Sequence, residues 1–256
     1  MADSAFDISG KVALVTGGNS GIGLGMAQAI ADAGGGVCIW GRNEEKNAAA
    51  AEQLRASGGD VLAIRCDVAN EEEVEQSFRA TLDHFGKVDG CFANAGIGGG
   101  GGPFQEMSTE AWRRVLGVNL DGTFFTYRAA VRHMIERGEG GRLIATSSVS
   151  SIDGAPRSLH YASSKGALNA LTRGLAVELA RHNITANSII PGWIETGMTE
   201  NTFANPRFEQ NVLKRIPFRR WGQPSDFGGI AVYLMSDASA YHTGDEFVID
   251  GGYTKF

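Results

Sequence analysis

The amino-acid sequence predicts an α/β protein built on a doubly wound parallel sheet with helices on both faces. Short apolar runs without clean alternation of apolar and polar residues recur along the chain, which is typical of strands buried on both faces. Longer segments with helical periodicity separate these runs, and a strand alternating with a helix indicates a parallel sheet. No Pro- or Ser-rich linker, internal repeat or break in composition interrupts the pattern, so residues 1–256 are predicted to form a single domain.

The predicted strands are rich in apolar and β-branched residues: Val12–Thr16, Val37–Gly41, Val61–Cys66, Val88–Ala93, Arg142–Ser148, Ile184–Ile190 and Glu246–Ile249. The predicted helices lie between them, at Ile22–Ala33, Glu44–Ser57, Glu71–Phe85, Thr109–Arg137, Tyr161–His182 and Ser225–Met235. Ligands of such sheets bind beyond the carboxyl ends of the strands, so we expect the site in the loops that directly follow them.

The charge balance and the N-terminal segment limit the partners. The chain has 23 Lys and Arg against 29 Asp and Glu, a net charge of −6, and no basic cluster longer than Arg219-Arg220. Nucleic acid is therefore not expected to bind. Asp3 and Asp7 stand where a signal peptide needs positive charge, and no apolar stretch approaches the roughly 18 residues that span a bilayer. We expect a cytoplasmic protein without a membrane segment.

Cysteine and glycine usage adds two constraints. Cys38, Cys66 and Cys91 lie in apolar runs without CxxC spacing, which indicates buried thiols, a reducing compartment and no metal site. Glycine accounts for 36 of 256 residues while proline accounts for only 6, and no collagen-like period appears. This composition indicates a chain with many tight backbone turns.

The first predicted loop is a glycine-rich turn that leads directly into a helix. Its glycines have GxxxGxG spacing, which allows a sharp turn and lets backbone N–H groups approach a pyrophosphate at the helix N-terminus. Methyltransferases and plain tight turns use glycine in the same way. We interpret the segment as a nucleotide-binding turn consisting of Gly17, Gly18, Asn19, Ser20, Gly21, Ile22 and Gly23.

The end of the second strand, Trp40-Gly41-Arg42-Asn43, indicates which dinucleotide binds. An acidic side chain there would accept hydrogen bonds from the adenosine ribose, whereas a basic one accommodates a 2′-phosphate. Gly41 stands in the place of the acid, and the Arg42 guanidinium that follows can hold a phosphate with two hydrogen bonds. The sequence therefore favours NADP(H) over NAD(H). The alternative is that Arg42 is a solvated residue at the start of a helix.

Tyr161 and Lys165 are four residues apart in a predicted helix and share one face. A nearby ammonium favours the phenolate and pulls the pKa of a tyrosine toward the working range of an acid or base. Ser148 ends the preceding predicted strand, where its hydroxyl can bond a substrate carbonyl oxygen. Other hydroxyls that could do the same belong to Ser147, Ser150 and Ser151.

Several motifs occur in a fixed order: TGGNSGIG at Thr16–Gly23, Asp67 after the third strand, ANAG at Ala93–Gly96, Asn119 within GVNLDGTF, Ser148 with Tyr161 and Lys165, and PG at Pro191-Gly192. In this order they resemble the short-chain dehydrogenase/reductase family, from about Gly10 to Gly252. The resemblance implies a Rossmann-like sheet of seven strands. One departure is Ala93, where the family usually has the first Asn of NNAG.

The resemblance implies a catalytic tetrad of Asn119, Ser148, Tyr161 and Lys165. During reduction Tyr161 would donate the proton to the carbonyl oxygen while Ser148 steadies that oxygen. Lys165 would lower the pKa of Tyr161 and bind the nicotinamide ribose, and Asn119 would hold a water in the proton relay. Ser148 precedes Tyr161 by thirteen residues, the family's usual spacing, which selects Ser148 over Ser147.

The remaining cofactor contacts are also implied by the resemblance. They are Asp67 and Val68 for the adenine, Asn94, Ala95 and Gly96 for the wall beside the cofactor, and Pro191, Gly192, Ile194 and Thr196 for the nicotinamide. The expected substrate contacts are Ser148, Ser150, Tyr161 and Trp193.

The family's variable lid corresponds to residues 193–221. Its larger apolar side chains suit an apolar or aromatic ketone, but side chains at such spacings more often form a helix core. They are Met198, Phe203, Phe208 and Phe218. Reduction of 3-oxoacyl thioesters is a common role of similar chains, although Val177 stands before Glu178 where carrier-protein reductases usually have a basic residue. The alternatives are oxidation of an alcohol or polyol with NAD, and a nucleotide-sensing protein whose catalytic residues have decayed.

Two longer-range expectations complete the prediction. The family usually forms tetramers through two long helices, and Thr109–Arg137 is long enough for that use, so we expect a homotetramer. The run Gly98–Gly102 follows the fourth strand and is either a hinge at the substrate entrance or a plain surface loop.

Overall fold

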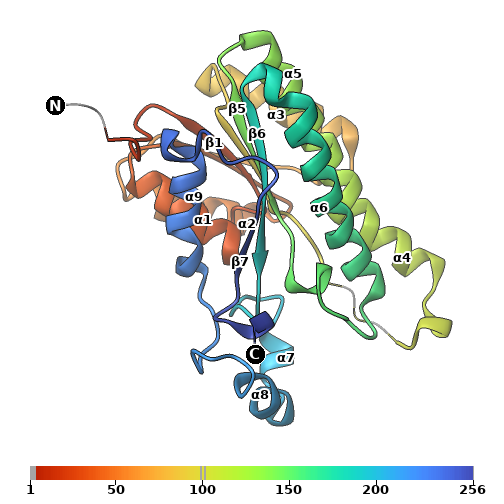
Figure 1. Cartoon of the computed structure of the whole chain (residues 1–256). Coiled ribbons are helices and arrows are strands. Elements are labelled where there is room, and N and C mark those ends of the chain that lie inside the picture. The colour runs from red at the N-terminus through yellow and green to blue at the C-terminus, as the bar shows by residue number, and fades with distance from the viewer. Residues whose placement is uncertain (1–3, 99, 101, 256) are drawn as a thin grey trace.

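The structure is a computed structural model that describes residues 4–98, 100 and 102–255. Its seven strands form one parallel sheet in the order β3-β2-β1-β4-β5-β6-β7 (Figure 1). The strands are β1 (Val12–Thr16), β2 (Gly36–Gly41), β3 (Val61–Arg65), β4 (Gly90–Ala93), β5 (Gly141–Thr146), β6 (Ile184–Pro191) and β7 (Glu246–Ile249). The strand order reverses between β1 and β4, which is the doubly wound topology, and the predicted fold class is confirmed.

The helices of the described residues cover both faces of the sheet (Figure 1). They are α1 (Gly21–Asp32), α2 (Glu44–Arg55), α3 (Glu71–Phe85), α4 (Thr109–Leu116), α5 (Gly122–Arg137), α6 (Leu159–Leu179), α7 (Glu200–Phe203), α8 (Pro206–Leu213) and α9 (Gly228–Met235). Along β1, Ala13 and Val15 pack in the core beneath α1 and α9, whereas Leu14 packs in the core beneath α3 and α5. Both faces of the central strands are therefore buried, as the uninterrupted apolar runs predict.

The long helix predicted over Thr109–Arg137 is present, but it contains one π-helical turn that the sequence did not predict. The segment forms α4, one π-helical turn at Gly117–Asp121, and then α5. Asn119 lies in the π turn, and its side chain is hydrogen-bonded to the backbone of Ile97. A π turn accommodates one extra residue and is common where a side chain must be directed at a functional site. This tertiary contact is not visible in the helical periodicity.

Other boundaries differ by a few residues. The strand predicted to end at Ser148 ends at Thr146, because the Ser148 side chain caps a short 3₁₀ turn at Val149–Ser151. The three cysteines are free and buried, and burial raises the pKa of the Cys66 thiol to about 11. Within the described ranges, no helix is long and apolar enough to cross a bilayer. The same part of the chain holds no cluster of three or more His, Cys, Asp or Glu residues suited to a metal ion.

Candidate active site

A cleft of about 850 Å³ opens at the carboxyl edge of the sheet. Its walls come from the loops after β1 to β6, because all of these parallel strands end at the same edge. In Figure 1 this is the edge toward which β6 runs, near α7. The cleft lies where the sequence predicts a site.

The floor at one end of the cleft is the glycine-rich turn and the N-terminus of α1. Gly17, Asn19, Ser20 and Gly21 line the cleft, and α1 begins at Gly21. The Ser20 side chain makes no capping hydrogen bond within the described structure, so the backbone N–H groups of the first turn stay free for a ligand. Free N–H groups at the start of a twelve-residue helix fit the pyrophosphate of a dinucleotide.

Gly23 has a packing role in this turn and does not line the cleft. A Cβ at Gly23 would lie 2.4 Å from Asn94 Nδ2 and 2.4 Å from the carbonyl oxygen of Gly17. Asn94 uses the space thus left free to donate hydrogen bonds to the carbonyl oxygens of Thr16, at 3.1 Å, and Gly17, at 3.4 Å. The absence of a side chain at Gly23 thus makes room for a brace between the loops after β1 and β4.

Two cations lie at the end of β2. The side chains of Arg42, which is 58% exposed, and Lys46, at the start of α2, both line the cleft. Arg42 Nη1 is 3.9 Å from Asp67 Oδ2, a separation at which a partly exposed pair contributes little energy. Asn43 does not line the cleft, because its side chain caps α2 by accepting a hydrogen bond from the backbone N–H of Lys46. The sequence missed Lys46, although its position one turn into the helix after Arg42 could have indicated it.

Ser148, Tyr161 and Lys165 meet at the other end of the cleft. The Lys165 ammonium is 3% exposed, donates to the carbonyl oxygen of Thr146 at 2.7 Å, and lies 5.6 Å from the centre of the Tyr161 ring. Burial lowers the pKa of Lys165 to about 8. Burial also raises the pKa of Tyr161, and a hydrogen bond with Ser148 partly offsets this rise. The net direction of the Tyr161 pKa is opposite to the expected lowering, because burial is its largest cause.

A chain of hydrogen bonds holds the backbone of Ser148. The Ser151 hydroxyl donates to the carbonyl oxygen of Ser148 at 2.6 Å, and Asn169 Nδ2 on α6 donates to the Ser151 hydroxyl at 3.1 Å. The backbone N–H of Ser150 donates to the Ser148 hydroxyl at 3.1 Å. The loop after β5 is thus tied to the helix that carries Tyr161 and Lys165.

Asn119 is fully buried and lies behind the wall of the cleft. Its Oδ1 accepts from the backbone N–H of Ile97 at 2.8 Å, and its Nδ2 donates to the Ile97 carbonyl oxygen and to the Ser164 hydroxyl, both at 3.1 Å. Ile97 itself lines the cleft. The Asn119 amide therefore fixes the position of a wall residue relative to α6.

The structure does not bring the predicted substrate contacts Ser150 and Trp193 to the cleft. Trp193 lines a separate cavity of about 220 Å³ and packs edge-on against Phe208 with ring centres 5.0 Å apart. Phe203 stacks on Trp221 in the same aromatic cluster. Of the apolar residues in the predicted lid, Met198 lines the cleft, whereas Phe203 and Phe208 form the core of the lid.

The other predicted cofactor residues do line the cleft: Ile22, Val68, Ala95, Gly96, Pro191, Gly192, Ile194 and Thr196, together with Asp67 and Asn94. The cleft also contains residues that sequence reasoning missed, among them Ile97, Arg114, Thr199 and Glu200. Arg114 and Glu200 carry no local motif, so no signal in the sequence could have found them. Of the run Gly98–Gly102, Gly98 lines the cleft, whereas residues 99 and 101 lie outside the described residues.

The fold and the cleft together define the class of dinucleotide-dependent oxidoreductases. The sheet is doubly wound, and the cleft has an open helix N-terminus at one end and a Ser, Tyr and Lys group at the other. Residues 17–254 match the family model described as "Enoyl-(Acyl carrier protein) reductase". The chain belongs to the short-chain dehydrogenase/reductase family.

Relatives of known activity span the whole chain. It is 36% identical to a 2,5-dichloro-2,5-cyclohexadiene-1,4-diol dehydrogenase of Sphingobium indicum, over 97% of this chain and 98% of that protein. It is 37% identical to a 3-oxoacyl-[acyl-carrier-protein] reductase of Chlamydia pneumoniae, over 96% of this chain and 97% of that one.

Among solved structures, a gluconate 5-dehydrogenase from Burkholderia cenocepacia J2315, in complex with NADP and tartrate, is similar. It is 36% identical with a TM-score of 0.93, covering 99% of this chain and 100% of that chain. The protein is thus an NAD(P)-dependent oxidoreductase that interconverts a carbonyl group and an alcohol.

Proposed function

We propose that the protein is an NADPH-dependent reductase of a ketone or 3-oxoacyl substrate, with Tyr161 as the acid. The observation that carries the proposal is the single cleft that joins the Ser148, Tyr161 and Lys165 group to Arg42 and Lys46. Two cations at the end of β2, with Gly41 in the place of a carboxylate, suit a 2′-phosphate.

The chemistry divides among the residues of the group. A nicotinamide cofactor held in this cleft would supply hydride to the carbonyl carbon. Tyr161 donates its phenolic proton to the carbonyl oxygen, and Ser148 donates a hydrogen bond to the same oxygen as charge develops on it. The raised pKa of Tyr161 keeps its proton in place until the substrate oxygen becomes basic enough to accept it. Lys165, with its pKa near 8, binds the nicotinamide ribose and supplies positive charge beside the phenol.

The remaining predicted residues act through the walls of the cleft. Asn119 positions Ile97, and Asp67 with Val68 forms the adenine end. Ile97 and Met198 supply apolar surface beside the catalytic group, which supports an apolar carbonyl substrate.

Oxidation of a polyol is the second candidate. Thr196, Thr199 and Glu200 line the cleft beside Met198 and could bond several hydroxyl groups. The gluconate 5-dehydrogenase and the diol dehydrogenase among the relatives favour this reading. A catalytically decayed nucleotide sensor fits less well, because Ser148, Tyr161 and Lys165 are all retained and line the cleft.

A panel of ketones, 3-oxoacyl thioesters and polyols, assayed with NADPH, NADH, NADP⁺ and NAD⁺, tests these proposals together. The expected result is reduction of an apolar ketone or thioester with a clear preference for NADPH. Activity on polyols alone, with NAD⁺, would establish the second candidate instead.

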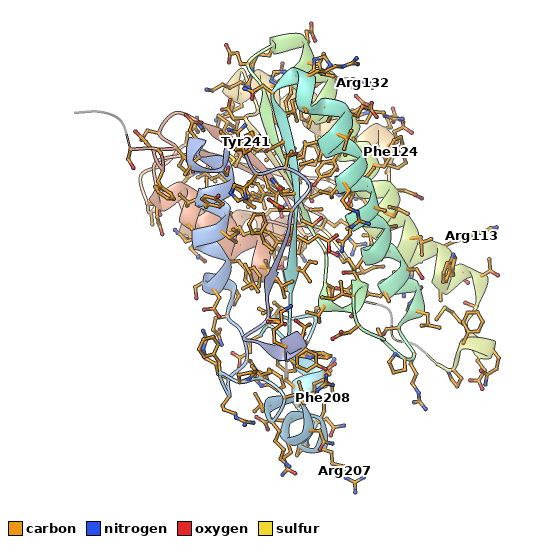
Figure 2. The ribbon with its side chains drawn as sticks, viewed as in Figure 1. Arg113, Phe124, Arg132, Arg207, Phe208 and Tyr241 are labelled. Carbon is orange, nitrogen blue, oxygen red and sulfur yellow. The ribbon has the colours of Figure 1, made fainter. Side chains whose placement is uncertain are left out.

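We also propose a single domain with a lid at residues 193–221, a homotetramer and a cytoplasmic location. Exposed apolar residues on the two long helices support self-association. Phe124 on α5, labelled in Figure 2, is 44% exposed. Val177 on α6 is 83% exposed. The three free buried thiols suit a reducing compartment. Light scattering at micromolar concentration should give four times the chain mass of 27.1 kDa, and a monomeric mass would contradict the tetramer.

A further inference from the structure

A pair of amide side chains lies beside the two cations at the end of β2. Asn47 on α2 is 4% exposed and does not line the cleft, whereas Asn19 in the glycine-rich turn does. Asn19 Nδ2 and Asn47 Oδ1 are 2.6 Å apart. A buried amide thus contacts an amide that faces the cofactor end of the cleft.

The direction of this hydrogen bond follows from the other partners of Asn47. Its Nδ2 donates to the carbonyl oxygen of Gly41 at 2.9 Å and to that of Ile64 at 3.1 Å, which uses both of its hydrogens. The Asn47 amide cannot be flipped, because its oxygen would then face two carbonyl oxygens. Its Oδ1 must therefore face Asn19 and accept, so Asn19 presents its nitrogen and keeps one N–H to donate elsewhere.

The amide pair also explains the glycine at position 41. A Cβ there would lie 2.2 Å from Asn19 Nδ2 and 2.5 Å from Asn47 Oδ1, closer than real contacts allow. A carboxylate at this position, which would accept hydrogen bonds from the ribose hydroxyls of NAD, and the amide pair compete for the same space. A side chain at position 41 would therefore have to displace the Asn19 amide from Asn47.

We propose that Asn47 is a positioning residue that holds Asn19 as a neutral donor to the adenosine 2′-phosphate, beside Arg42 and Lys46. Asn47 acts entirely through Asn19, and Gly41 leaves room for the pair. The inference rests on the NADPH preference proposed above and adds two residues that set it.

Adenosine 2′,5′-bisphosphate and adenosine 5′-monophosphate differ only in the 2′-phosphate and test the inference without any turnover. Their dissociation constants are measured by calorimetry on wild-type protein and on the Asn19→Ala and Asn47→Leu variants. Each variant should bind the bisphosphate about tenfold more weakly, the loss expected for one hydrogen bond to a charged group. Binding of the monophosphate should stay within about twofold, which general damage to the fold would not allow.

The double variant tests whether Asn47 affects phosphate binding through Asn19. Asn47→Leu should add no further loss in the Asn19→Ala background, because nothing remains for Asn47 to position. Gln53→Leu is the matched control, an amide replaced on the same helix but away from the cleft, and both ligands should bind to it as to wild type. Should Asn47→Leu fold poorly, because the carbonyl groups of Gly41 and Ile64 lose their donors, Asn19→Ala still tests the contact from inside the cleft.

The outcomes separate this inference from the proposed function. If wild-type protein binds the bisphosphate no more tightly than the monophosphate, the NADPH preference and the inference both fail. If wild-type protein discriminates but Asn19→Ala discriminates equally well, the inference alone is overturned. Additive losses in the double variant would likewise overturn the positioning role of Asn47.

Discussion

Replacing Asn119 by alanine removes all three hydrogen bonds of its buried amide, two to Ile97 and one to Ser164. Each such bond contributes about 1 kcal/mol net, so the free energy of unfolding should fall by about 3 kcal/mol. Urea unfolding followed by circular dichroism measures this loss as a lower midpoint at unchanged slope. The kcat should also fall, because Ile97 loses its tie to α6.

Two comparisons make the Asn119 prediction specific. Ser164→Ala leaves both bonds to Ile97 intact but removes the bond from Asn119 and the bond that Ser164 donates to the Tyr161 carbonyl oxygen, so it should cost about 2 kcal/mol. Asn201→Ala, at an exposed position on α7, should stay within about 0.5 kcal/mol of wild type. If Asn119→Ala destabilises the protein no more than Asn201→Ala while activity is lost, the amide has a direct catalytic role and the reasoning from its buried contacts is wrong.

Three further outcomes follow from the site. Tyr161→Phe should lower kcat by about 10²–10⁴-fold while NADPH binding, followed by nicotinamide fluorescence, is retained, and reduction near the wild-type rate would refute the acid role. Ser151→Ala should lower kcat with little change in KM, because it breaks the bond to the Ser148 carbonyl oxygen, and Ser151→Thr should restore the rate. Between pH 8 and 9 the cofactor-free protein should gain about 1 kcal/mol of stability relative to Lys165→Met, because Lys165 titrates near 8 when folded but near 10.5 when unfolded. Over this range the unfolded chain binds more protons than the folded one, so the free energy of unfolding rises with pH. Equal changes in both proteins in chemical denaturation would contradict the lowered pKa of buried Lys165.

The fold was predictable because strands of a parallel sheet that are buried on both faces require uninterrupted apolar runs in the sequence. The apolar runs gave each of the strands, and the order of the motifs placed the site at their carboxyl ends. The π turn at Gly117–Asp121 was not predictable, because the partner of Asn119 within it is Ile97, a residue in a distant loop. Periodicity reports which face of a helix is buried but not which polar side chain finds a partner.

Within the site, residue types were predicted better than side-chain directions. Ser150 and Trp193 lie in the predicted loops but do not line the cleft, and Trp193 packs against the aromatic core of the lid. Lys46 and Arg114 reach the cleft from helices whose positions are set by packing. Which face a loop residue presents depends on contacts between distant segments, and no local pattern encodes them.

The amide pair at the end of β2 shows why such contacts matter for specificity. Asn47 bonds the carbonyl oxygens of Gly41 and Ile64, which belong to neighbouring strands held in register by the pairing of Gly41 with Arg65. The register of β2 and β3 therefore determines which way the Asn47 amide faces, and that amide in turn determines which atom Asn19 offers to the cofactor. From the sequence, Gly41 is notable only because a carboxylate is absent there. In the structure, the amides of Asn19 and Asn47 occupy the space that a side chain at position 41 would need. It follows that adding an acid at position 41 should displace Asn19 as well as introduce a charge, so that a change in cofactor preference would have two physical causes.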